Sequence, residues 1–299
     1  MNNINKKQNT SELLLYLFAQ RKLYSRSKGI LSIFFCVSLF FYILGAISFI
    51  QNNIYFKLFY VLWLMSFIIL SIRESNKLNN AANIQEIVDR TLFGFDLFSP
   101  KIKTTELHKL AIQLKNKYTN EYEFEVTHNG EDGGVKDWYS NVEGVPRNRA
   151  IILCQIENCE WELNLRREFQ RINILLFALL IIIYLIIYRT TSIVVLISSL
   201  YPLLTLLIDR LGYIYKNYKN IKEGEDINKS LIEIYENIHL YNNDNIINKA
   251  KEIQSCIYER RCKFAPIPNK FYNLRRKYFQ KHSNEFISDL KEKLREETG

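Results

Sequence analysis

The fold of this chain is decided by two neighbouring stretches, ILSIFFCVSLFFYILGAISFI at residues 30–50 and IYFKLFYVLWLMSFIILSI at residues 54–72. Each is apolar almost throughout, and a helix needs about 20 such residues to cross the roughly 30 Å of hydrocarbon in a bilayer. The three residues that separate them, 51–53, leave room only for a turn. The two stretches therefore predict a transmembrane hairpin.

A second pair of apolar stretches covers residues 172–188 and 193–208, with four residues between them. It predicts a second hairpin, with a kink around Ser198 because Pro202 removes one backbone hydrogen bond. No Asp, Glu, Lys, Arg or His lies deep in any of the four stretches, which argues against an ion-coupled transporter or a proton pump. The alternative interpretation of these stretches is a set of core helices buried in a soluble protein.

The formal net charge of +9 is concentrated beside the predicted spans. Lys and Arg outnumber acids in residues 1–29 and recur just after the second span, just before the third and just after the fourth, whereas the hairpin turns hold few. Basic residues next to spans favour the cytoplasmic face. The N-terminus, the middle region and the C-terminus are thus all predicted to be cytoplasmic, and the positive charge is interpreted as topology rather than affinity for DNA or RNA.

The chain is therefore expected to be a mainly α integral membrane protein with four transmembrane helices in two hairpins and a mostly helical cytoplasmic region. We divide it into a cytoplasmic N-terminal segment (1–29), a first hairpin (30–72), a cytoplasmic middle domain (73–171), a second hairpin (172–208) and a helical C-terminal domain (209–299).

Local patterns predict the elements of the cytoplasmic parts. Residues 121–127 alternate between acidic and other side chains, which predicts a short strand or an extended arm. Thr104 or Thr105 is predicted to cap a helix. A helix from about residue 148 is expected to continue into the third span as far as residue 188, over a length on the order of 60 Å. The C-terminal domain is expected to be helical, with a break at Pro266 and Pro268.

Catalytic and metal-binding motifs are not found in the sequence. The four histidines are isolated, and the cysteine pairs 154/159 and 256/262 lack the two-residue spacing of a zinc knuckle, which favours free thiols. Glu157 and Glu160 are expected to form ion pairs with Arg166 and Arg167 on the same helix. We therefore expect no enzyme activity, no cofactor and no metal.

Several short motifs resemble those of a bacterial family, the SMODS-associating four-transmembrane effectors of cyclic-oligonucleotide-based antiphage signalling systems (CBASS). QRKLYS at residues 20–25, just before the first span, is similar to the family's Ala-Gln-Arg-x-Leu-Tyr-Ser motif. The resemblance continues in order along nearly the whole chain, through Phe95-Asp96, Asp137-Trp138-Tyr139, the Cys154-Gln155-Ile156-Glu157-Asn158 run, Trp161, Leu165 and Arg166. Ser140, Ile156 and Leu97 depart from residues that are common in the family.

The resemblance implies a function. A nucleotidyltransferase would make a cyclic oligonucleotide messenger during phage infection, and the messenger would bind the cytoplasmic part of this protein. Binding would drive homo-oligomerisation or rearrangement, and the spans would disrupt the bacterial inner membrane and arrest or kill the infected cell. The implied partners are the lipid bilayer, the cyclic nucleotide and further copies of the chain.

Candidate ligand-binding residues are chosen because aromatic rings stack on bases and arginines pair with phosphates. They are Trp138, Tyr139, Arg147, Arg149, Arg166 and Arg167. The alternative is that the tryptophans are core anchors and the arginines are charges that flank the membrane. Structural roles are assigned to the remaining motif residues, Gln20, Arg21, Tyr24, Asp96, Gln155, Asn158 and Trp161.

A competing function is that of a membrane-anchored interaction or regulatory module without pore activity. A constitutive ion channel is a further possibility, although no filter-like segment is found.

Overall fold

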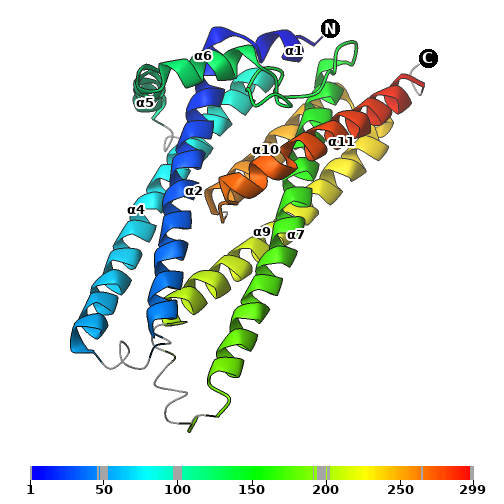
Figure 1. Cartoon of the computed structure of the whole chain (residues 1–299). Coiled ribbons are helices and arrows are strands. Elements are labelled where there is room, and N and C mark those ends of the chain that lie inside the picture. Colours follow the sequence, from blue (N-terminus) through cyan, green and yellow to red (C-terminus); the bar gives the residue numbers. More distant parts are fainter. Residues whose placement is uncertain are drawn as a thin grey trace.

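The computed structural model describes residues 2–45, 47, 53–96, 103–190, 192–193, 200, 203–263 and 265–296. Within these ranges the chain is helical and has no β-strand beyond one isolated bridge between Asn129 and Lys136. The predicted mainly α class is confirmed (Figure 1).

Three very long helices dominate the molecule: α2 (Ser11–Gly45), α4 (Ile54–Phe93) and α7 (Arg147–Ile187). Each has an apolar part long enough to cross a membrane and a further part that carries polar residues. At 1.5 Å per residue, the 41 residues of α7 extend over about 60 Å. The predicted continuous helix from the middle domain into the third span is therefore confirmed.

Half of the fourth predicted span, residues 194–199 and 201–202, lies outside the described residues, and so does the expected kink at Ser198. Residues 46 and 48–50 of the first predicted span and residues 51 and 52 of the first turn also lie outside them. Helix α9 (Leu204–Glu236) begins within the last residues of that stretch and passes beside α7. Three of the four predicted spans are thus seen as helices.

The apolar parts of the long helices present their side chains outward. Leu175 of α7 is 69% exposed and Ile69 of α4 is 63% exposed, and they belong to a large set of exposed Ile, Leu and Phe residues on the same parts of the helices. Such an extensive apolar surface is expected to be covered by lipid. Inside the first pair, α2 and α4 pack through aromatic rings, and Ser38 Oγ accepts a 3.1 Å hydrogen bond from Trp63 Nε1.

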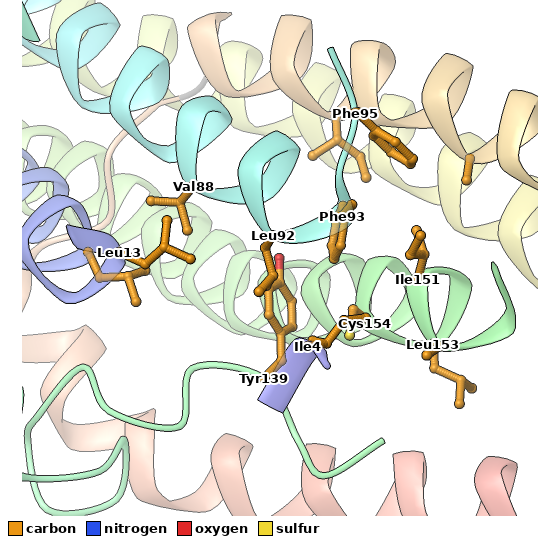
Figure 2. Packing of buried hydrophobic residues seen from close by; sticks show 14 of the residues in the cluster. Ile4, Leu13, Val88, Leu92, Phe93, Phe95, Tyr139, Ile151, Leu153 and Cys154 are labelled. Atoms are coloured by element: carbon orange, nitrogen blue, oxygen red, sulfur yellow. The ribbon is translucent and has the colours of Figure 1, made fainter. Parts of the chain in front are cut away.

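The other half of the molecule is a helical bundle around a large apolar core, with a smaller apolar cluster of Leu165, Phe169, Ile267 and Phe279. Five further helices, α1 (Ile4–Lys7), α5 (Thr104–Lys117), α6 (Thr119–Thr127), α10 (Asn243–Lys263) and α11 (Asn269–Glu296), together with a short 3₁₀ turn at Ile238–Leu240, complete it. Figure 2 shows part of this core, in which Leu92 and Phe93 of α4 and Cys154 of α7 lie near the ring of Tyr139. The core joins the polar ends of the long helices into one unit.

Two local predictions were wrong. Residues 119–127 form helix α6 rather than a strand, because acids four positions apart, Glu121 and Glu125, both meet Lys22 of α2, and the ring of Tyr122 packs edge-on against Phe18. Helix α5 begins at Thr104 with Lys103 at the cap position and no side-chain cap hydrogen bond, so neither threonine caps it. The break at Pro266 and Pro268 falls between α10 and α11, as predicted.

Close packing of α9 against α7 and α10 depends on Gly224. A Cβ added there would lie 2.5 Å from Arg260 Nη1 and 2.8 Å from Leu163 Cδ2, whereas among the described residues nothing would lie within 4 Å of a Cβ at Gly212 on the same helix. We expect Gly224→Ala to lower the free energy of unfolding by about 1–3 kcal/mol through overpacking. Gly212→Ala should instead raise it by up to about 1 kcal/mol through helix propensity.

Thermal unfolding of the two variants in detergent tests this prediction. Equal melting temperatures for Gly224→Ala and the wild type would show that the helices do not approach each other this closely.

Candidate functional site

A cavity of about 240 Å³ lies in the helical bundle, away from the apolar parts of the long helices, where these helices meet α6, α10 and α11. Helix α2 lines it with Gln20, Arg21, Tyr24, Ser25 and Lys28, and α7 lines it with Asn158, Trp161, Glu162, Leu165 and Arg166. Each group has the three- and four-residue spacing that places side chains on one face of a helix. The cavity is therefore a product of two helix faces that oppose each other.

Four aromatic side chains surround the cavity: Tyr24, Trp138, Trp161 and Tyr272. The rings of Trp161 and Tyr272 are 5.3 Å apart at a tilt of 58°. Both tryptophans, Asn158 and Tyr272 also line a smaller adjoining cavity of about 70 Å³. The rings of Trp138, Trp161 and Tyr272 thus form an aromatic wall that the two cavities share.

Three of the four cations that line the cavity are held by carboxylates. Arg166 Nε donates to Glu162 Oε1 at 2.8 Å, and Arg261 Nη1 donates to Asp89 Oδ2 at 2.6 Å. Arg21 lies 3.4 Å from Glu125 Oε2 and also donates to the backbone oxygen of Gly133 at 2.6 Å. The guanidinium groups are consequently fixed in direction before any ligand arrives.

Glu162 is the carboxylate that organises one end of the cavity. Its two oxygens bind two buried arginines, Arg166 and Arg260. Burial by itself raises the pKa of Glu162, but the two arginines more than offset this effect and hold the pKa at about 2. Arg166 also donates to Asn217 Oδ1 and to the backbone oxygen of Ala265, both at 2.9 Å, so this cluster joins α7, α9 and α10.

A second polar network lies behind the cavity and centres on Asp89 of α4. Its carboxylate accepts the Tyr139 hydroxyl at 2.8 Å in addition to Arg261. Asn158 Nδ2 donates to the same hydroxyl at 3.1 Å. Tyr139 is almost fully buried, and this burial raises its pKa well above the ordinary value. Its phenol is thus a structural donor that links the loop before α7 to α4.

The cavity therefore brings together, from widely separated parts of the sequence, most of the motifs that the sequence analysis singled out. The model of one protein family, described as the SMODS-associating 4TM effector domain, matches residues 2–290. The chain belongs to this family. No curated protein and no solved structure matches the chain. Membership confirms the resemblance stated above and makes the chain a multi-pass membrane effector of the CBASS type.

The predicted site residues of this effector fall into two sets. Those that line the cavity are Gln20, Arg21, Tyr24, Trp138, Asn158, Trp161 and Arg166. Tyr139 borders the adjoining cavity. Gln155 lines neither cavity, and its side chain donates to Gln254 Oε1 at 3.2 Å and to the backbone oxygen of Ala250 at 2.9 Å. Gln155 therefore joins α7 to α10 within the core.

Four other predicted residues lie away from the cavity. Arg147 donates to the backbone oxygen of Phe93 at 2.7 Å and so caps the end of α4. Arg167 pairs with Glu225 on the exposed surface at 2.8 Å. Arg149 is half-buried and does not line the cavity. The backbone oxygen of Asp96 accepts a 2.9 Å hydrogen bond from Arg90.

The expected ion pairs of Glu157 and Glu160 with Arg166 and Arg167 were wrong. Glu157 instead accepts hydrogen bonds from the backbone and hydroxyl of Ser140, and Glu160 accepts from Asn228. The helical spacing places 162, not 157 or 160, one turn from residue 166.

Sequence reasoning missed Lys28, Asp89, Arg261 and Tyr272. A signal existed for Lys28, because residues 20, 24 and 28 repeat at four-residue intervals on one face of α2. No local signal pointed to the other three residues, which lie on other helices.

Glu157 gives the fold a dependence on pH. Its side chain is nearly fully buried, and this burial, only partly offset by the Ser140 hydrogen bonds, raises its pKa from 4.5 to about 7. The folded state therefore holds a proton that the unfolded state releases between about pH 4.5 and pH 7, so stability falls as the pH rises through this window. A shift of about 2.5 pH units at roughly 1.4 kcal/mol per unit gives a loss of up to about 3 kcal/mol.

Glu157→Gln cannot titrate, so we expect it to remove this loss of stability. The melting temperature of the variant minus that of the wild type should therefore be larger at pH 8 than at pH 5. Ser140→Ala removes a hydrogen-bond donor that stabilises the ionised form of Glu157. It should therefore raise the pKa of Glu157 further and extend the loss of stability to higher pH. Parallel melting curves for wild type and Glu157→Gln across this range would contradict the assignment.

Proposed function

We propose that this effector binds a cyclic nucleotide messenger in the cytoplasmic cavity and responds by oligomerising and disrupting the bacterial inner membrane. The expected result in an infected cell is growth arrest or death. The N- and C-termini face the cytoplasm in this proposal, since basic residues flank the spans on that side. Figure 1 is consistent with this orientation, because both termini lie at the end of the molecule that holds α5 and α6.

The chemistry of the cavity suits a nucleotide. Bases stack on aromatic side chains irrespective of their sequence, and Trp138, Trp161 and Tyr272 present such rings. Phosphates are bound by arginine and lysine, and Arg21, Lys28 and Arg261 line the same space. Of the predicted ligand-binding residues, Trp138 and Arg166 line the cavity and Tyr139 borders the adjoining one. Arg147, Arg149 and Arg167 line neither cavity and are given no contact with the ligand.

Helix continuity is the observation that carries the proposal. Helices α2, α4 and α7 each contribute side chains to the cavity and each continue without a break into an apolar span. A ligand that changes the spacing of these helices in the cytoplasm necessarily moves their membrane parts. Such a ligand shifts the equilibrium toward the membrane-disrupting state only if it binds that state more tightly than the resting state.

The test is dye release from liposomes that carry the purified protein, with a panel of cyclic di- and trinucleotides. We expect one nucleotide to cause release. Trp138→Ala should lose about 1–3 kcal/mol of stacking, which raises the nucleotide concentration required for release by roughly 5- to 150-fold. Tyr218→Ala, which removes an exposed aromatic side chain away from the cavity, should behave like the wild type.

Release without any nucleotide would instead indicate a constitutive pore. No release under any condition, from protein shown to be folded and inserted, would favour the competing function of a membrane-anchored interaction module.

A further inference from the structure

Among the described residues, Lys28 differs from the other cations of the cavity in having no carboxylate partner. Arg21, Arg166 and Arg261 each pair with a carboxylate. Within the described part of the chain, no carboxylate lies within 4.0 Å of Lys28 Nζ, and that atom donates no hydrogen bond. The ammonium lies over the rings of Tyr272 and Tyr24, whose centroids are 4.9 and 5.9 Å from Nζ.

The surroundings of Lys28 favour an incoming anion. Burial, and then the neighbouring charges of Arg166 and Arg21, lower the pKa of Lys28 to about 8, and only Glu162 acts in the opposite direction. A desolvated ammonium without a partner is unfavourable, and a bound anion would relieve both the desolvation and the repulsion. The cation–π contacts with the two tyrosines hold the side chain in place meanwhile.

Other buried polar atoms around the cavity also lack partners. Among the described residues, Gln20 Oε1, Trp161 Nε1 and Arg261 Nη2 have no hydrogen-bond partner. Gln20 and Arg261 are 2% and 3% exposed. Buried polar atoms in native proteins are almost always hydrogen-bonded, so these three indicate a ligand that offers both acceptors and a donor, as the edge of a base and its phosphate do.

Position on the helix gives Lys28 a second role. It is one turn beyond Tyr24 on α2 and two residues before residue 30, where the first apolar stretch begins. Helix α2 is unbroken from Ser11 to Gly45. A force on Lys28 is therefore transmitted to the first span with no intervening loop.

We propose that Lys28 binds a phosphodiester group of the nucleotide, and that this contact couples occupancy of the cavity to the first spanning helix. The inference rests on the proposed function, and it adds the residue that recognises the anion and the helix that responds.

A phosphodiester is also present in lipid headgroups, and Lys28 is close enough to the predicted membrane surface for a lipid to compete. The chemistry at Lys28 is the same for both sources. Binding is therefore measured in maltoside micelles free of phospholipid, by titration with cyclic dinucleotides of adenine, guanine and uracil and with cyclic triadenylate, and then repeated after addition of phosphatidylglycerol.

The variants are Lys28→Met, Lys28→Arg and, as a matched control, Arg26→Met, which removes an exposed cation two residues away that does not line the cavity. Loss of an ion-paired hydrogen bond of about 1.5–3 kcal/mol should weaken nucleotide binding by Lys28→Met on the order of 10- to 100-fold. Lys28→Arg should recover most of the affinity, and Arg26→Met should bind as the wild type does. Circular dichroism and gel filtration confirm that each variant is folded.

The outcomes separate this inference from the proposed function. Equal affinities of Lys28→Met and the wild type would overturn the inference and leave the proposed function standing. If no nucleotide of the panel binds the wild type, both fail. If phosphatidylglycerol displaces the nucleotide from the wild type and no longer does so from Lys28→Met, the phosphodiester that Lys28 binds is that of a lipid.

Dye release tests the coupling separately. At a nucleotide concentration that saturates both proteins, Lys28→Met should release less dye than the wild type. Equal release at saturation would show that Lys28 contributes affinity alone and would overturn its coupling role.

Discussion

A backbone N–H or C=O group that enters hydrocarbon has no water to bond with, so it must be hydrogen-bonded within its own helix. Over the described residues of their apolar parts, helices α2, α4 and α7 meet this requirement by remaining uninterrupted. The same helices continue beyond their apolar parts into the helical bundle. Within their described residues, α2, α4 and α7 therefore connect the bundle to the apolar parts without an intervening loop.

Buried charge gives the helical bundle its specific arrangement. Glu162 holds Arg166 and Arg260, and Asp89 holds Arg261 and Tyr139. Removing one partner of a buried pair leaves an uncompensated charge, which costs several kcal/mol. The helices can therefore change their relative positions only if these clusters move as units or exchange partners, and an anionic ligand that competes for the arginines provides a reason for them to do so.

The energy required for the proposed change is within reach of one bound nucleotide. Moving an equilibrium from 1:99 to 99:1 requires about 5.5 kcal/mol of differential binding. One phosphate contact of about 1.5–3 kcal/mol and two stacked bases of about 1–3 kcal/mol each supply that amount, provided that they form mainly in one state. The aromatic wall of Trp138, Trp161 and Tyr272, between two hollow regions, is a suitable place for these contacts to differ between states.

The architecture was largely predictable from the sequence, because it rests on local properties. Apolar runs of membrane length, basic flanks and three- to four-residue periodicity determine the long helices, including the passage of α7 from residue 147 into its span. The prediction from local pattern was wrong at residues 121–127, where the spacing of the acids suits either a strand or a helix. Contacts with Lys22 and Phe18 of α2 stabilise the helix.

The functional site, by contrast, was decided by tertiary structure. The sequence motifs include Gln20, Trp138, Asn158 and Trp161, but no local pattern indicates that these residues line one cavity. Asp89 and Arg261 are 172 residues apart and still form one ion pair, and Lys28 stands out only because its neighbours in space already have partners. Hydrophobic periodicity is a property of a segment, whereas charge pairing and cavity shape are properties of how distant segments pack.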